Sequence, residues 1–136
     1  MKKLSLLLAA LLILSGTVVC AEWETFKSED GMYEYTKDGV ITAYYGDEFA
    51  FFPAEIDGTK INEIGVMACF DSGIEYISLA EGIELINTNA FEGCNAKSAY
   101  IPSSVKNIGE RAFANCANLN EVTLNSEEIT FDFDVF

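Results

Sequence analysis

Apolar residues recur at a fixed interval through the second half of the chain. Residues 86–94 and 108–116 place Ile, Ala, Phe and Cys at equivalent positions, 22 residues apart, with mostly polar residues between them. A weaker copy over residues 64–72 lies a further 22 residues upstream. A period in the low twenties is typical of a solenoid, because one coil of that size is too small to bury its own apolar side chains. The pattern therefore predicts stacked coils over residues 64–136.

Each repeat is expected to contain a turn followed by a short strand. The turns are predicted to be short and helical, with the Ala-Phe pair facing inward, at residues 66–71, 88–92 and 110–114. The strands are predicted at residues 76–79, 99–101 and 121–124, and parallel strands of successive coils stack about 4.8 Å apart. Pro102 follows the second strand and bends the chain away, since proline gives a ladder no donor.

Residues 32–52 show a different pattern, in which aromatic and β-branched residues alternate with polar ones and turns fall at Gly39 and Gly46. This alternation predicts a small antiparallel β meander. The first coil of a solenoid would expose its core without a cover, so we interpret the meander as an N-terminal antiparallel β cap. A hairpin turned by Asp57-Gly58 is expected to follow.

The predicted organisation has four parts. Residues 1–21 are a signal peptide and residues 22–31 a lead-in. Residues 32–63 hold the cap and a first partial repeat, and residues 64–136 hold repeats of period 22–23, of which the last is incomplete.

The first 21 residues are typical of a secretory signal. Lys2 and Lys3 give a positive start, the apolar run at 6–14 is too short to span a bilayer as a helix, and small residues precede a cleavage site before Glu22. This predicts a secreted, extracellular protein without membrane insertion after cleavage. The alternative is a lipoprotein anchored through an acylated Cys20, although the β-branched residue before Cys20 fits that signal poorly.

The strongly acidic composition limits the partners that the chain is expected to bind. All 22 Asp and Glu residues follow residue 21, whereas only six of the eight Lys and Arg residues do, which gives this part a net charge of −16. Such a surface repels phosphate backbones and anionic lipids, so nucleic-acid and peripheral membrane binding are disfavoured. The 136 residues suffice for one domain.

Candidate catalytic and metal-binding chemistry is sparse. The chain has no histidine, which removes Ser-His-Asp and Cys-His constellations and the usual imidazole metal ligand. No Cys-x-x-Cys spacing and no Asp-x-Asp-x-Asp-Gly calcium loop occurs in the sequence. Carboxylate pairs are numerous, but none has a spacing that singles it out as an acid–base pair. We therefore predict a protein that is not an enzyme, without a cofactor or a metal.

The repeats resemble the BspA-type leucine-rich-repeat family of secreted bacterial proteins. Residues 101–116 follow its pattern, Ile-Pro-x-x-Val-x-x-Ile-Gly-x-x-Ala-Phe-x-x-Cys, almost without gaps, and Leu119, Val122 and Leu124 match its strand. The sequence departs from the pattern at Cys69, Ser72, Ala80 and Asn87. The resemblance covers roughly residues 32–136. It implies a right-handed α/β repeat solenoid, mostly β with short helical turns, a binding or adhesion role at the cell exterior, and no catalytic residues.

Three cysteines follow the predicted cleavage site. Cys94 and Cys116 share a repeat position, so their Cα atoms are expected one coil apart, within reach of a disulfide, and an exported chain permits that bond. The alternative is that both are small buried residues stacked in a ladder, which the burial habit of cysteine favours. Cys69 is expected in the core.

One outward row of strand residues is the candidate ligand-binding site. The residue between the two inward residues of each strand points away from the core. Aligned by repeat, these residues are Phe51, Ser78, Tyr100 and Thr123, with Ser98 and Glu121 beside them. Exposed aromatic side chains on a sheet suit contact with a carbohydrate or a peptide. The alternative is that Phe51 and Tyr100 only shield neighbouring strands or the cap.

The last residues permit two interpretations. Residues 131–136 align with residues 108–113 at a period of 23, so that a further repeat begins and reaches its Phe position. In this case an apolar end stays open, and self-association through the C-terminal end follows. In the other case a capping strand turns its apolar residues inward, and acidic residues on its outer edge block association. The apolar residues of that strand are Ile129, Phe131, Phe133 and Val135.

Two functions remain open at this point. The first is a secreted, non-enzymatic binding or adhesion module that recognises a protein or glycan at a cell surface through the strands. The second is a structural fragment or spacer of a longer repeat protein, without a ligand of its own.

Overall fold

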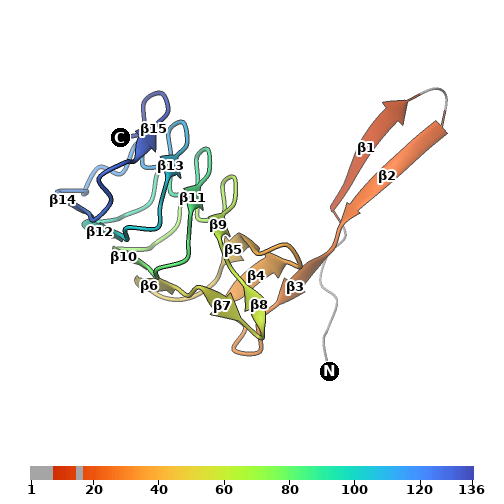
Figure 1. Ribbon diagram of the computed structural model, residues 1–136, viewed down its shortest axis with the longest axis horizontal. Helices are drawn as coiled ribbons and strands as arrows, with labels where there is room; N and C mark the ends of the chain where they lie inside the picture. Colours follow the sequence, from red (N-terminus) through yellow and green to blue (C-terminus); the bar gives the residue numbers. More distant parts are fainter. Residues whose placement is uncertain (1–7, 15–16) are drawn as a thin grey trace.

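The computed structural model describes residues 8–14 and 17–136 (Figure 1). β1 (Leu8–Leu14) and β2 (Thr17–Trp23) pair antiparallel. The predicted signal peptide falls on these two strands and on residues 1–7 and 15–16, which lie outside the described ranges, and it stays a prediction.

A four-stranded parallel sheet runs along one side of a stack of coils (Figure 1). Its strands are β6 (Phe49–Phe52), β10 (Tyr76–Leu79), β12 (Ser98–Ile101) and β14 (Glu121–Leu124). Ile77 lies between Ala50 and Ala99 in the register, and Ala99 lies opposite Val122, so equivalent repeat positions are neighbours in space. The predicted strands are confirmed, the second of them starting one residue earlier.

A second sheet forms the opposite edge of the coils. Its parallel part consists of β5 (Val40–Tyr44), β9 (Glu63–Ile64), β11 (Leu85–Ile86), β13 (Asn107–Ile108) and β15 (Thr130–Phe131). β3 (Thr25–Lys27) and β4 (Tyr33–Thr36) extend it antiparallel from β5. β7 (Glu55–Ile56) and β8 (Thr59–Lys60) form a separate hairpin. The Asp57-Gly58 turn of this hairpin, with φ of 48° and 82°, is as predicted.

The antiparallel meander lies earlier in the chain than the sequence predicts. It spans β3 to β5, whereas residues 49–52, predicted as its last strand, form β6 and pair in parallel with β10. The physical reason is the burial of Ala50 and Phe52, which supply the inward residues of the first coil. Tyr33 and Tyr44 pack against Phe52 at ring-centroid distances of 6.3 and 5.4 Å. A capping role for the meander stays a prediction.

The predicted helical turns are wrong, because the described part of the chain forms turns without a helix at these positions. The same part of the chain contains no helix long and apolar enough to cross a membrane. Alternate amides in these turns donate in different directions. Ala68 N donates to Gly65 O within its own coil (3.2 Å), whereas Cys69 N donates to Ala90 O of the next coil (2.8 Å). In an α-helix the amides after the first turn donate to the carbonyl four residues earlier, whereas here alternate amides donate to the next coil, so the turns are not helical. The other two turns repeat the scheme: Phe91 N donates to Ala112 O and Phe113 N donates to Val135 O.

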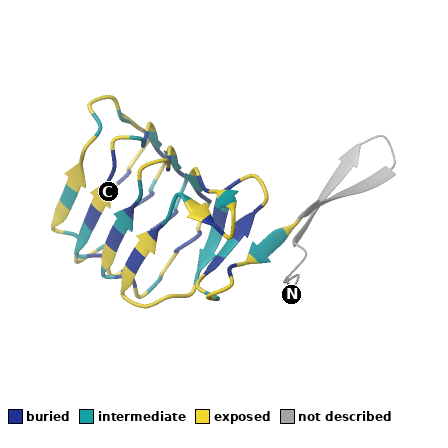
Figure 2. Cartoon of the chain, turned by 60° about the horizontal axis from the view of Figure 1, so that its bottom comes forward, coloured by how far each residue is buried: buried dark blue, intermediate teal, exposed yellow. Residues whose placement is uncertain are grey.

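Buried residues recur in every coil (Figure 2), and their side chains fill the inside of the stack. Ala90 and Phe91 are fully buried, as the repeat pattern predicts, and the Phe91 ring stacks on that of Phe113 with centroids 5.2 Å apart. The first turn has Cys69 in the Phe position, and there the ring of Phe52 meets Phe91 edge-on at 5.5 Å. The core is therefore one continuous ladder from coil to coil.

Candidate binding face

The outward row predicted from the strands is brought together by the parallel register. Phe51 lies opposite Ser78, Ser78 opposite Tyr100, and Tyr100 opposite Thr123. Phe51 is 54% exposed and Tyr100 is 41% exposed, while Ser78 is half-buried and Thr123 is exposed. The four residues form one line across the four-stranded sheet, on the side away from the core.

A second outward row runs beside the first, two residues earlier on each strand. Tyr76 lies opposite Phe49 and Ser98, and Ser98 lies opposite Glu121. The rings of Phe49 and Tyr76 stack with centroids 4.8 Å apart and planes 5° from parallel. We call the two rows together the strand face: Phe49, Phe51, Tyr76, Ser78, Ser98, Tyr100, Glu121 and Thr123.

Sequence reasoning named Ser98 and Glu121 in this second row but missed Phe49 and Tyr76. The signal was present, because the alternation that turns Phe51 outward also turns Phe49 outward. Phe49 is the more exposed of the two, at 63%. The strand face is therefore more aromatic than the sequence analysis predicts.

Contacts at its borders hold the aromatic side chains of the strand face in place. The Tyr100 hydroxyl accepts a hydrogen bond from Asn125 Nδ2 at 2.6 Å, and Tyr33 donates its hydroxyl to the carbonyl of Phe51. Desolvation by burial, followed by the charges of nearby groups, raises the pKa of Tyr33 to about 12, so this donor stays protonated at neutral pH. In the sheet beneath, β10 and β12 have a hydrogen-bonded strand on each side, whereas β6 and β14 are the edge strands.

A cation lies at one border of the strand face. Lys97, which directly precedes Ser98, places its Nζ 2.5 Å from Glu75 Oε2 and 5.7 Å from the ring centroid of Tyr76. The hydrogen bond to Glu75, and then the charges of Glu75 and Glu48, raise the pKa of the Lys97 ammonium. Glu48, Glu75 and Lys97 directly precede β6, β10 and β12, respectively, so they lie in a row at the N-terminal ends of these strands.

Cys94 and Cys116 lie one above the other, as their shared repeat position predicts. Their Sγ atoms are 3.3 Å apart and both are free thiols, as is the buried Cys69. A disulfide bond has sulfurs about 2.05 Å apart, so the pair is stacked and unbonded here, and the disulfide stays a prediction. The hydrogen bond between them lowers the pKa of the Cys94 thiol and raises that of Cys116.

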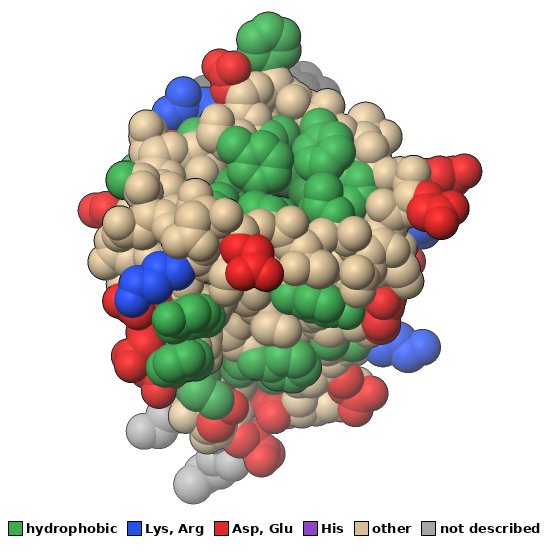
Figure 3. Space-filling model, turned by 90° about the vertical axis from the view of Figure 1, so that its left-hand side faces the viewer, with side chains coloured by type: hydrophobic (Ala, Val, Ile, Leu, Met, Phe, Trp, Pro, Cys, Tyr) green, Lys and Arg blue, Asp and Glu red, His purple; other side chains and the backbone are tan. Residues whose placement is uncertain are grey.

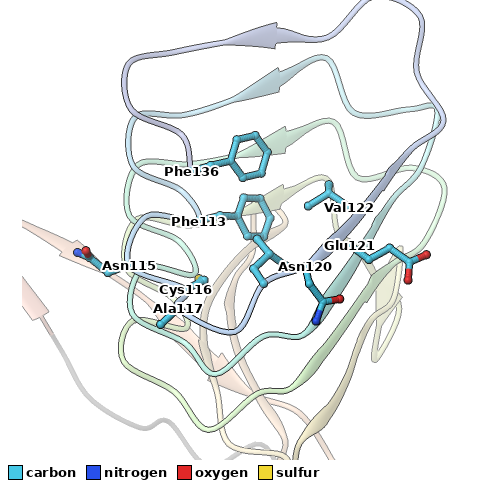
Figure 4. A pocket seen from close by; sticks show the side chains of 9 residues that line it. Phe113, Asn115, Cys116, Ala117, Asn120, Glu121, Val122 and Phe136 are labelled. Carbon is cyan, nitrogen blue, oxygen red and sulfur yellow. The ribbon is translucent and has the colours of Figure 1, made fainter.

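A cavity of about 370 Å³ opens at the last coil (Figure 4). The rings of Phe113 and Phe136 stand one above the other inside it, with centroids 5.8 Å apart, while the Glu121 side chain points away. The other lining residues are Asn115, Cys116, Ala117, Leu119, Asn120 and Val122. Seen from this end, hydrophobic side chains gather in a hollow of the surface (Figure 3).

The last residues continue the contacts of the repeats, and both interpretations of this end stay predictions. Phe136 takes the Phe position of a further repeat, and β15 pairs with β13 in the repeat register. Of the apolar residues of that strand, Phe131 lies opposite the buried Ile108 and Val135 is buried, whereas Phe133 is 78% exposed.

No metal centre is apparent in the part of the chain that the structure describes. There, no three Cys, Asp or Glu side chains are grouped so that they could hold an ion. The strand face presents aromatic rings, hydroxyls and the Glu121 carboxylate, groups that can make stacking contacts and hydrogen bonds.

A family model for the BspA type leucine rich repeat region matches residues 50–136, in six copies. The chain belongs to this family. The resemblance noted from the repeats is thereby confirmed, and the matched model describes a repeat region rather than an enzyme. No curated protein gives a significant match to this BspA-type chain.

Two solved structures are similar to this BspA-type chain. The T. pallidum leucine rich repeat protein TpLRR matches with a TM-score of 0.66 and 23% identity, over 83% of this chain and 52% of its own. The pneumococcal vaccine antigen PcpA matches with a TM-score of 0.44 and 13% identity, over 82% of this chain and 39% of its own. The first likeness supports the leucine-rich-repeat fold, and the chain spans only about half the length of TpLRR.

Proposed function

We propose that this BspA-type chain is a non-enzymatic binding or adhesion module that contacts a protein or a glycan through its strand face. The observation that carries the proposal is the set of exposed aromatic side chains in register on one regular sheet: Phe49, Phe51, Tyr76 and Tyr100. Aromatic rings provide a large contact area at low cost in conformational entropy, and their exposure in one patch is typical of an interaction site.

We place this activity outside the cell. The apolar run after Lys2 and Lys3 supports export, and the resemblance of the repeats to the BspA-type family implies a role at the cell exterior. Release after cleavage before Glu22 is the first expectation, and anchoring through an acylated Cys20 is the alternative. Globomycin treatment of the producing cell distinguishes them, because it blocks processing of a lipoprotein signal only.

The test of the binding face compares an alanine variant on the strand face with an alanine variant of an exposed aromatic residue elsewhere. The purified chain is applied to arrays of glycans and of extracellular proteins, and each hit is measured again with Tyr100→Ala. We expect Tyr100→Ala to weaken binding roughly tenfold, as truncation of a central aromatic contact does. Phe70→Ala is the matched control, because Phe70 is 47% exposed but lies in a turn away from the strand face. Equal effects of the two variants on every hit would remove the strand face from consideration.

A second candidate function is that of a spacer within a longer array of repeats. The position of Phe136 on the Phe113 ring favours it, since a further coil placed there would cover the 370 Å³ cavity. Such a coil comes from the same polypeptide or from a second copy of the chain. Light scattering of the purified chain over a range of concentrations tests the second source, with Phe136→Ala as the variant expected to abolish any dimer.

A further inference from the structure

We propose that the partner recognised by the strand face is a basic segment of a protein, with one Lys or Arg side chain seated on Tyr76 and paired with Glu75. This rests on the proposed function, because it assigns a ligand chemistry to the same face. Lys97 occupies that position in the structure described here and acts as an internal occupant of a cation site.

The first observation is the set of groups around the Lys97 ammonium. It makes an ion pair with Glu75 at 2.5 Å and lies 5.7 Å from the centroid of the Tyr76 ring. A ring face and a carboxylate are the groups that hold a lysine or arginine side chain, by cation–π attraction and charge-assisted hydrogen bonds. The Lys97 side chain is still 44% exposed, so the site is open to solvent and to exchange of its occupant.

The second observation is that the aromatic surface is larger than Lys97 covers. Phe49 stacks on Tyr76 and remains 63% exposed, and Tyr100 lies on the adjacent strand in the neighbouring row. One lysine therefore covers one corner of the strand face. A basic segment that crosses the strands would place further cationic or aliphatic groups on Phe49 and Tyr100.

Charge complementarity selects this partner among the candidate classes. Glu48 and Glu75 lie beside the strand face and Glu121 lies in its second row, whereas Lys97 is the cation at this border. The chain after residue 21 has 22 acidic and six basic residues, a net charge of −16, which steers cations toward it and repels a second copy, nucleic acid and anionic lipid. A neutral glycan could use these carboxylates only as hydrogen-bond acceptors, without the charge pairing that a Lys or Arg side chain adds.

The experiment measures binding of a fluorescein-labelled peptide of alternating Arg and Gly, with a citrulline-containing peptide of equal length as the uncharged reference. Fluorescence polarisation with the whole chain is recorded at low and at physiological salt. We expect binding of the arginine peptide only, weakened by salt. Tyr76→Ala should lower the affinity about three- to tenfold, and Tyr76→Phe should restore it, because the ring face is retained.

Two further variants separate a specific site from general attraction to an acidic protein. Glu75→Gln should weaken binding several-fold, whereas Glu128→Gln, which removes the same charge from an exposed position off the strand face, should leave it unchanged. Lys97→Met vacates the site and should strengthen binding of the arginine peptide. Equal losses for Glu75→Gln and Glu128→Gln, or no gain from Lys97→Met, would overturn the cation site.

The two proposals fail in different ways. If the arginine peptide does not bind, while a glycan or neutral protein binds in a manner that depends on Tyr100, the cation site is wrong and the binding face stands. If no array hit depends on Tyr100 and the peptide does not bind, both are wrong.

Discussion

The strands within the stack and the strands at its C-terminal end share a sequence pattern, yet their burial differs. Ile101 at the end of β12 is fully buried, whereas Leu124, its neighbour in the register, is 40% exposed. Ile108 is fully buried, whereas Phe131 opposite it is 44% exposed. The inward direction of these side chains belongs to the motif, but their burial depends on a neighbouring coil on each side. The core of one repeat is therefore completed by side chains of the repeats on either side of it.

The largest expected effect compares one leucine position in two coils. Leu79 is 1% exposed within the stack, and Leu124 occupies the equivalent strand position in the last coil. Leu79→Ala should lower the free energy of unfolding by about 2–5 kcal/mol, the usual cost of a cavity in a core. Leu124→Ala should cost less than about 1 kcal/mol, since much of its surface is already in water. Urea denaturation of the two variants measures both values, and equal costs would contradict the comparison.

A smaller effect is expected where two coils approach most closely. A Cβ atom on Gly109 would lie 2.7 Å from Thr88 N and 2.8 Å from Asn87 C. Gly109→Ala must push the coils apart and should destabilise by about 1–3 kcal/mol. Gly73→Ala is the control, because a Cβ there meets nothing within 4 Å. An equal shift of the melting temperature in both variants would show that the close approach at Gly109 does not cause the loss of stability.

The smallest effect concerns a carboxylate that links these two coils and depends on pH. The buried Glu92 accepts hydrogen bonds from Asn89, Arg111 and Asn115, and the bond from Arg111 is the main cause that lowers its pKa from the ordinary 4.5. A lowered folded-state pKa adds stability above the unfolded-state pKa, and this stability is lost as the pH falls through the folded-state value.

The measurement for Glu92 is the melting temperature of the wild type and of Glu92→Gln between pH 7 and pH 3. The wild type should be the more stable at pH 7, and the difference should shrink as the pH falls below about 4.5. Glu84→Gln, which removes the exposed partner of Lys106, should show little difference at either pH. A gap between wild type and Glu92→Gln that stays constant with pH would contradict this role.

The spacing of apolar residues was sufficient to predict the stack, the parallel strands and the inward Ala-Phe pairs, because burial in a repeat follows directly from period. It also predicted the outward row that includes Tyr100. The turns could not be predicted this way, because their hydrogen bonds join residues 21 or 22 positions apart, such as Met67 to Thr88. Met67 and Arg111 also adopt left-handed φ values of 56°, which their residue types do not signal.

The position of β6 and the role of Lys97 were missed for related reasons. Residues 49–52 lack the Leu and Ile of the later strands, and the alternation that identifies a strand does not distinguish an antiparallel neighbour from a parallel one. Lys97 has no neighbour in the sequence that signals its contact. Its contact with Tyr76 exists because the register sets residues 75 and 97 side by side, and no local pattern carries that information.

The alternating direction of the turn amides also governs where the repeats tolerate a change of length. Odd-numbered amides such as those of Cys69, Phe91 and Phe113 face the neighbouring coil, and the even-numbered ones between them do not. One residue inserted into a turn would reverse the direction of every amide that follows it there. The amides that now donate to the neighbouring coil would then meet no acceptor. The strand registers of 22 residues between Ile77 and Ala99 and 23 between Ala99 and Val122 place the extra residue after Cys116, in the loop. The loop can therefore accept an extra residue, whereas the turn must keep its length so that its alternate amides still face the neighbouring coil.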